Sequence, residues 1–319
     1  MLLRTKGAWV GGWLPAPMLA TFALFASLPF WIKGVGLYPY LGVEVMIWII
    51  FALGFNLLLG YGGLPSFGHG AYFGVGAYAF GLAQFHVSPS LWVCLGAAIL
   101  AGGVAGALVA LFISHRRGIY YALLTIAFGQ IFWFVAIKWH SVTRGEDGLL
   151  NIKRPAFLES LDALYWFCFA VFVLVVVLLW RLVNAPYGRV LSAIRQNETR
   201  ARFVGYNVWA YKWLAFVIST LVAGLAGGLF ALAQQSAYPN VMSLHQSGFV
   251  VMMALVGGGL VSFWGPVVGA VLFFVARDLL GAYTEAWLLW YGLLFMAIVL
   301  FRPEGIAGIL KDVRSKSSA

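Results

Sequence analysis

Ten long apolar runs, separated by short polar segments, dominate the chain. They cover residues 18–37, 41–59, 66–84, 91–113, 118–138, 163–183, 214–233, 248–263, 265–282 and 286–301. Most of these runs approach the roughly 20 residues that an α-helix needs to cross the hydrocarbon core of a bilayer. The pattern therefore predicts an all-α fold, a polytopic membrane helical bundle with no soluble domain of ordinary size.

The number of spans depends on the runs near the C-terminus. Polar residues continue through 234–247, which leaves an apolar stretch of about 10 to 14 residues, the length of a re-entrant half-helix. If 248–282 forms a re-entrant hairpin, the protein has about eight transmembrane helices; otherwise it has about ten. Both numbers are even, so both predict that the two termini lie on the same side.

The runs divide the chain into three parts. These are an N-terminal segment (1–17), a transmembrane domain (18–301) that contains a polar internal loop (184–213), and a basic tail (302–319). Arg4 and Lys6 precede the first apolar run, a pattern typical of a retained signal anchor.

Composition agrees with a membrane protein. The chain is 63% hydrophobic and only 9% charged, and its mean hydropathy of +0.93 lies outside the range of soluble domains. Cys94 and Cys168 lie in separate apolar runs without paired spacing or a nearby His cluster. The sequence therefore indicates neither a disulfide framework nor a metal site, and we expect both cysteines to be small core residues.

Basic residues are distributed unequally between the two predicted sides. With the N-terminus inside, fourteen of the 20 basic residues and three of the ten acidic residues fall on the cytoplasmic side. The basic ones are Arg4, Lys6, Arg116, Arg117, Arg181, Arg189, Arg195, Arg200, Arg202, Lys212, Arg302, Lys311, Arg314 and Lys316. The positive-inside rule then predicts cytoplasmic N- and C-termini. The outer segment 138–162, with Lys138, Arg144, Lys153 and Arg154, argues weakly against this orientation.

The internal loop concentrates charge. Between Tyr187 and Lys212 it carries five basic residues and one acidic residue, Glu198. Val190, Leu191, Ile194 and Ala201 fall near one face of a short helix, with Arg195, Thr199 and Arg202 on another and a stop at Gly205 and Asn207. Such an amphipathic helix suits a groove in a partner protein. The alternative, a loop that only fixes topology or contacts anionic lipid, remains open.

Two glycine-rich segments, 54–81 and 254–270, share the pattern GGLxSF at 62–67 and 258–263. Pro65 interrupts the first of them, so we expect broken helices, and both copies turn at the cytoplasmic side, as in a parallel repeat. The alternative is a chance recurrence in a chain with 38 glycines. Candidates for the translocation path or its gates are Asn56, Tyr61, Gly62, Gly63, Pro65, Ser66, Phe67, His69, Tyr72, Gly258, Gly259 and Ser262.

For each of these candidates, tight helix packing is the competing interpretation. His69 is a lone His among glycines, a pattern more typical of a packing residue, and Asn56 is as well suited to joining helices as to contacting a solute. Three aromatic candidates, Tyr61, Phe67 and Tyr72, could contact an apolar side chain of the solute.

Catalytic motifs are absent from the sequence. There is no P-loop, HExxH, GxSxG or Cys/His metal pattern, so neither ATP hydrolysis nor proteolysis can be assigned to this chain and no cofactor is expected. Glu44, Asp278 and Glu285 fall near predicted helix ends, so a mid-membrane proton or ion relay is not evident. The composition and motifs favour a transport subunit over an enzyme.

Three separated motifs carry a family resemblance. LGFNLLLGYGGLPSFGHGAYFGVGAY, then YGRVLSAIRQNETRARFVGYNV with KWLAFVISTLVAGLAGGLFAL, and finally LVGGGLVSFWGPVVGA closely resemble LivM-type permeases of bacterial branched-chain amino acid ABC importers. The resemblance runs from about Glu44 to Arg302. It implies a multi-pass protein of the bacterial inner membrane that works with a LivH-type sister permease, two ATP-binding subunits and a periplasmic binding protein. Partner subunits would use the ATP, lipid would surround the chain, and nucleic acid is not an expected partner.

The resemblance also implies that the basic loop couples the permease to the ATPase. The positions concerned are Arg189, Ile194, Arg195, Asn197, Glu198, Arg200, Ala201, Arg202 and Gly205. The generic importer pattern has Glu-Ala-Ala with Gly six residues after the Glu, whereas Gly205 follows Glu198 by seven. The expected function is import of branched-chain amino acids or a similar small solute (urea, an amide or an aromatic acid) by alternating access. A self-contained secondary transporter or channel is the alternative.

Overall fold

The computed structural model describes residues 9–10, 14–36, 38–258, 262–301 and 305. Apart from two paired two-residue strands, β1 (Trp9–Val10) and β2 (Leu14–Pro15), every regular element among these residues is helical, which confirms the all-α prediction. Residues of the predicted basic tail other than Gly305 lie outside the described part of the chain.

Each of the ten predicted apolar runs corresponds to a helix. The elements are α1 (Ala16–Trp31), η1 (Ile32–Val35), α2 (Tyr40–Asn56), η2 (Leu57–Gly62), α3 (Gly70–His86), α4 (Leu91–Ile113), α5 (Gly118–Lys138), α6 (His140–Thr143), η3 (Gly145–Asp147), η4 (Ala156–Leu158), α7 (Leu161–Asn184), α8 (Pro186–Gln196), α9 (Glu198–Phe203), α10 (Val208–Gln234), η5 (Pro239–Met242), α11 (Leu244–Gly258), α12 (Gly265–Tyr283) and α13 (Trp287–Phe301). The main differences are a shorter first helix, which ends at Trp31, and an α10 that begins six residues before the predicted start.

Six of the described helices are long and apolar enough to cross a membrane. They are α2 with η2, α4, α5, α7, α10 and α12. Shorter apolar helices occur at Ala16–Trp31, Leu244–Gly258 and Trp287–Ile298. The chain is therefore built as a multi-pass membrane protein, while the total of eight to ten spans stays a prediction.

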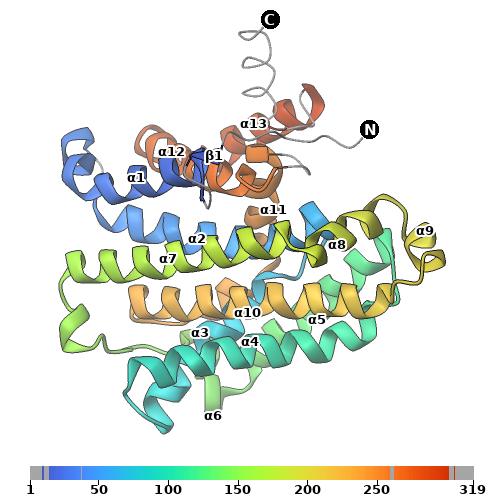
Figure 1. Cartoon of the computed structure of the whole chain (residues 1–319). Coiled ribbons are helices and arrows are strands. Elements are labelled where there is room, and N and C mark those ends of the chain that lie inside the picture. Colours follow the sequence, from blue (N-terminus) through green and yellow to red (C-terminus); the bar gives the residue numbers. More distant parts are fainter. Residues whose placement is uncertain (1–8, 11–13, 37, 259–261, 302–304, 306–319) are drawn as a thin grey trace, which may run out of the picture.

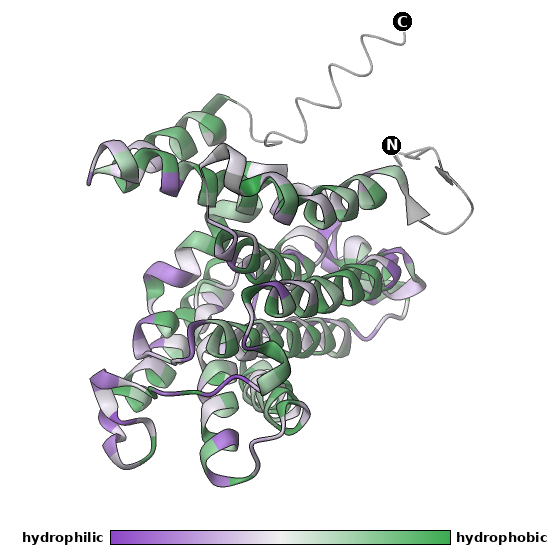
Figure 2. Cartoon of the chain, turned by 90° about the vertical axis from the view of Figure 1, so that its left-hand side faces the viewer, coloured by the Kyte–Doolittle hydropathy of each residue, from purple (hydrophilic) through white to green (hydrophobic). Residues whose placement is uncertain are grey.

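Helix α2 lies at the centre of the bundle. It is almost wholly buried within the chain, and α7, α10, α11 and α12 pack against it. Helices α2, α7, α10 and α4 run side by side, with α1, α12 and α13 across one face and α8 and α9 at one end (Figure 1). The hydrophobic colour follows the helices and much of the hydrophilic colour gathers in their connections (Figure 2).

Glycines allow α10 to approach α3 and α4 at backbone distance. A Cβ on Gly227 would overlap the Phe73 carbonyl of α3, and a Cβ on Gly76 would overlap the Gly224 backbone. Without a hydrophobic driving force between helices in lipid, such close packing is a main source of helix association. The glycine pattern of these helices therefore has a packing role.

Replacing Gly227 by valine is expected to destabilise the bundle, because overpacking a tight contact costs about 1–3 kcal/mol. Gly96→Val in α4 is the matched control, since a Cβ there meets nothing within 4 Å. Thermal unfolding in detergent should show a lower midpoint for Gly227→Val only. Equal midpoints for both variants would contradict the packing role.

The loops gather at two opposite ends, as the predicted topology requires. At one end Arg117, between α4 and α5, lies 2.8 Å from Glu198. At the other, Gln84 bonds with the backbone of Lys153, and Leu149 pairs with Ala237. We call the first the coupling end and the second the outer end; the assignment of the coupling end to the cytoplasm stays a prediction.

Two of the three carboxylates predicted near helix ends, Glu44 and Asp278, bind the same arginine, Arg277. Glu44, near the start of α2, accepts two hydrogen bonds of 2.9 Å from Arg277 near the end of α12. Arg277 also donates to Asp278 at 3.0 Å and lies over the Phe274 ring. These ionic groups therefore tie α2 to α12.

Candidate coupling loop and glycine-rich segments

Helix α8 is amphipathic and begins at Pro186, whose fixed φ and missing N–H suit the first turn of a helix. Gly188, Leu191 and Ile194 are buried on one face, while Arg189 is exposed. Leu191 and Ile194 are therefore buried as predicted. Arg195, predicted on the opposite polar face, is instead half-buried and bonds to the Gly60 carbonyl. The predicted single helix is nevertheless two helices, because Asn197 is extended and separates α8 from α9.

Helix α9 has a defined cap at each end. The Asn197 side chain accepts a hydrogen bond of 2.8 Å from the Arg200 N–H, which satisfies one of the free donors of the first turn. At the other end Gly205 has φ +100°. The Gly205 N–H bonds to the Arg202 carbonyl and the Tyr206 N–H to the Ala201 carbonyl, the two bonds of a Schellman motif. The predicted stop at Gly205 is confirmed, and Asn197 and Gly205 set the length of α9.

The coupling loop has a small hydrophobic core of its own. Ile194 of α8, Ala201 of α9 and Val208 of α10 are buried together. The Tyr187 ring stacks on Tyr211 with centroids 5.5 Å apart, and burial raises the pKa of the Tyr187 phenol. The three helix segments therefore form one packed unit.

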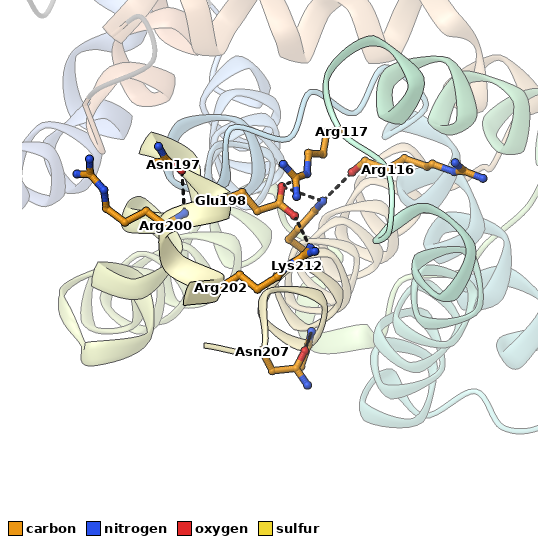
Figure 3. A network of polar contacts seen from close by, with 9 residues as sticks. Arg116, Arg117, Asn197, Glu198, Arg200, Arg202, Asn207 and Lys212 are labelled. Carbon is orange, nitrogen blue, oxygen red and sulfur yellow. Dashed lines mark hydrogen bonds and ion pairs between the residues drawn. The ribbon is translucent and has the colours of Figure 1, made fainter. Parts of the chain in front are cut away.

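Glu198 lies inside a network of basic groups. Its carboxylate is 2.8 Å from Arg117, 3.5 Å from Arg202 and 3.7 Å from Lys212. Lys212 is 1% exposed, and its ammonium also donates to the Arg116 carbonyl at 2.6 Å. The labelled residues of Figure 3 show how α9, α10 and the α4–α5 connection meet at this carboxylate. Glu198 thus links the loop to the bundle.

The outward part of the loop combines apolar and basic residues. Phe203 is 87% exposed and Val204 71% exposed. The exposed Arg200 and Arg202 precede them on α9. We call Arg200, Arg202, Phe203 and Val204 the exposed tip. The sequence-based candidates lack its two apolar members, although an apolar pair within a basic loop was a usable signal.

Arg195 connects α8 to the end of the central helix. Its guanidinium donates to the carbonyl of Gly60 in η2, and burial lowers the pKa of the group from its usual value. Gly63 follows η2 in the left-handed region, with φ +64°. A Cβ at Gly63 would lie 2.8 Å from Cγ of Arg195, so the two elements are in close contact.

The predicted break near Pro65 is present. No regular helix covers 63–69, and the backbone there is held by side chains of other helices. The Phe67 N–H donates to Thr125 of α5 at 3.1 Å, and the Gly70 N–H to Ser247 of α11 at 2.9 Å. Non-helical backbone at membrane depth needs such partners. Thr125 and Ser247 had no distinguishing sequence signal.

His69 is fully buried in the interior of the bundle. Ser219, near the middle of α10, donates to the Gly54 carbonyl at 2.6 Å and lies 2.9 Å from Nε2 of His69. Because the Ser219 proton is used by Gly54, Nε2 of His69 donates to Ser219. The rings of Phe51 and Tyr72 pack around His69. His69 therefore joins the broken segment to α10.

The two glycine-rich segments meet. The Asn56 amide donates to the Ser262 carbonyl at 3.2 Å, and Gly258 packs against Gly265 of α12. Gly259 lies outside the described residues.

The remaining path candidates differ in burial. Gly62, Ser66 and Tyr72 are buried, whereas Tyr61, Pro65 and Phe67 are half-buried. Asn56 and Ser262 bring the two segments into contact, whereas Phe67 bonds to Thr125 of α5 and Gly63 packs on Arg195 of α8.

Among the described residues no group of three or more His, Cys, Asp or Glu side chains forms a metal site. Cys94 and Cys168 are buried, as predicted.

Comparison with known proteins decides the family. The family model described as the permease component of the branched-chain amino acid transport system matches residues 39–302 of the chain. The chain belongs to this family. Its members are ABC transporter permeases, so the protein is a multi-pass membrane protein, in bacteria of the inner membrane.

Relatives within this permease family differ in the solute that their names state. The chain is 31% identical over 288 residues to the high-affinity branched-chain amino acid transport system permease protein LivM of Salmonella typhimurium, covering 82% of this chain and 68% of the relative. It is 30% identical over 288 residues to LivM of Escherichia coli, with the same coverage. It is also 29% identical over 101 residues to a nucleoside ABC transporter permease of Lactococcus lactis, covering 31% of this chain and 30% of the relative. No solved structure matches the chain.

Proposed function

We propose that this chain is the permease subunit of an ABC importer that moves branched-chain amino acids, or a similar small solute, into the cytoplasm by alternating access. Two ATP-binding subunits, a LivH-type sister permease and a periplasmic binding protein complete the transporter. The solute crosses between the two permeases, and this chain performs no covalent chemistry.

The observation that carries the proposal is the construction of the coupling loop. A loop that only fixed topology would need positive charge and no defined shape. Helix α9 instead has a cap at each end, α8 and α9 share a core with α10, and Glu198 ties α9 to the α4–α5 connection. The exposed tip combines an unburied aromatic ring with arginines, the residue types enriched at the centres of protein interfaces. Its partner would be an ATP-binding subunit with an apolar cleft and an acidic rim.

The mechanism follows from this arrangement. ATP closes the pair of ATP-binding subunits, their movement displaces α8 and α9, and the displaced unit rocks the helices to which it is tied. Glu198 carries the movement toward α10 and the α4–α5 connection, because its carboxylate contacts both.

The proposal predicts that solute uptake depends on the partner subunits. The purified chain reconstituted alone should show no uptake, whereas co-expression with the sister permease, ATP-binding subunits and binding protein should give vanadate-sensitive uptake. Robust transport by the lone chain would overturn the proposal in favour of a self-contained transporter or channel.

The solute class is tested separately. We expect the binding protein of the assembled transporter to bind leucine, isoleucine or valine. Uptake of radiolabelled leucine should be competed by isoleucine and valine and not by a nucleoside. Competition by a nucleoside alone would replace the proposed solute and leave the coupling loop unaffected.

A further inference from the structure

The central helix ends in an unusual way, directly beside the coupling loop. Residues 57–62 form a π-helix, η2, that continues α2. Single-turn π-helical segments are rare and occur frequently at functional sites. The last four carbonyls of any helix lack a partner within that helix. Gly60 is among them, and its carbonyl accepts a hydrogen bond from the Arg195 guanidinium of α8.

Arg195 therefore acts as a cap on a helix far from it in the sequence. A cation at a helix C-terminus is favoured by the helix dipole, and bonding to a charged donor is stronger than bonding to a neutral one. The aliphatic part of Arg195 packs on Gly63, whose φ of +64° reverses the chain into the broken segment. A Cβ placed on Gly62 would lie 3.6 Å from Leu191, also of α8. Helix α8 thus contacts η2 and the residue that follows it through the guanidinium and aliphatic part of Arg195 and through Leu191.

Further contacts reach the second glycine-rich segment. The Asn56 side chain lies directly over Gly60, because a Cβ at Gly60 would overlap its carbonyl oxygen. The same side chain donates to the Ser262 carbonyl at 3.2 Å. Trp180, in the last turns of α7, packs on Phe263 with ring centroids 5.1 Å apart. Helix α8 therefore contacts the first glycine-rich segment, and α7 contacts the second.

We propose that Arg195 is a positioning residue that makes α8 and the π-helical end of the central helix move as one body, so that displacement of the coupling loop reaches both glycine-rich segments. The proposal rests on the docking proposed above for the coupling loop. Arg195 faces the bundle, not the exposed tip, so its loss should leave the ATP-binding subunits attached.

The first test compares Arg195→Met with Arg195→Lys in the complete transporter. Methionine keeps apolar length against Gly63 but removes the donor to the Gly60 carbonyl, whereas lysine keeps a charged donor. We expect the ATP-binding subunits to co-purify with both variants and to hydrolyse ATP. Solute moved per ATP should fall about tenfold for Arg195→Met, a factor within the range that typical coupling free energies between sites produce. For Arg195→Lys it should stay within about threefold of wild type. Normal transport by Arg195→Met would overturn the proposal.

The second test replaces the hydrogen bond by a covalent one. A Cβ at Gly63 would lie 3.5 Å from the Cβ of Arg195, within the range of about 3.5–4.5 Å found in disulfides. Gly63→Cys and Arg195→Cys are introduced together into a chain with Cys94→Ala and Cys168→Ala. Gly63→Cys alone in the same background is the control for strain at the left-handed position.

The disulfide should act as a redox switch on coupling. Under reduction the double variant should resemble Arg195→Met, and after oxidation solute moved per ATP should return toward that of the Gly63→Cys control. An oxidised sample that remains uncoupled would overturn the rigid link. Co-purification of the ATP-binding subunits in both redox states separates this result from failure of docking: if the wild-type loop does not bind them, the proposed function fails first.

Discussion

Phe203→Asp is expected to weaken the binding of the permease to the ATP-binding subunits while leaving the permease itself folded. The ring is 87% exposed, and exposed substitutions usually change stability by less than about 0.5 kcal/mol. An aromatic anchor at the centre of an interface contributes far more, about 2 kcal/mol or roughly 30-fold in Kd. A carboxylate at this position would also face the acidic rim proposed for the partner.

Phe157→Asp provides the matched control, because Phe157 is an exposed ring, at 62% exposure, in η4 in the chain between α5 and α7. Titrating the purified ATP-binding subunits against each detergent-solubilised permease measures the two affinities directly. Weakened binding by Phe203→Asp alone supports the exposed tip as the docking surface. Equal affinities for the two variants would remove Phe203 from the interface.

The positions of the helices could be predicted because lipid imposes a simple pattern. Helix α5 occupies Gly118–Lys138, the predicted run, since charged residues flank its apolar sequence. Helix α10 was predicted to start at 214 because Lys212 interrupts the apolar pattern. It begins at Val208 because Asn207 caps it and Lys212 finds partners in Glu198 and the Arg116 carbonyl. Tertiary bonds of this kind override a local polar signal.

In the candidate site, too, local features could be predicted from the sequence and long-range contacts could not. Capping residues are local, so the stop at Gly205 was readable from the sequence. The donor for the Gly60 carbonyl comes from Arg195, and the partner of His69 is Ser219 in the middle of α10. Such pairs depend on how distant helices pack, which one sequence does not encode in any local pattern. The same limit explains why Glu198 was placed in the loop without its link to Arg117.

Glu198→Gln is expected to destabilise the coupling loop and to uncouple ATP hydrolysis from transport. One carboxylate, 14% exposed, balances Arg117, Arg202 and Lys212. Neutralising it leaves three cations facing one another, while the Lys212 ammonium keeps its bond to the Arg116 carbonyl. The cost should lie between that of an exposed pair and that of a buried pair, about 2 kcal/mol. Glu159→Gln, an exposed acid at the outer end, should change neither stability nor coupling.

A double-mutant cycle with Lys212→Met distinguishes an ionic link from loss of a well-placed side chain. If Glu198 and Lys212 stabilise each other, then the double variant should be more stable than the sum of the single effects predicts, by about 1 kcal/mol. Thermal unfolding in detergent measures stability, and uptake per ATP in proteoliposomes measures coupling. Additive effects would mean that Glu198 acts through Arg117 and Arg202 and not through Lys212. Because Lys212 belongs to α10 and Arg117 to the α4–α5 connection, that result would leave the α4–α5 connection as the route from Glu198 into the bundle.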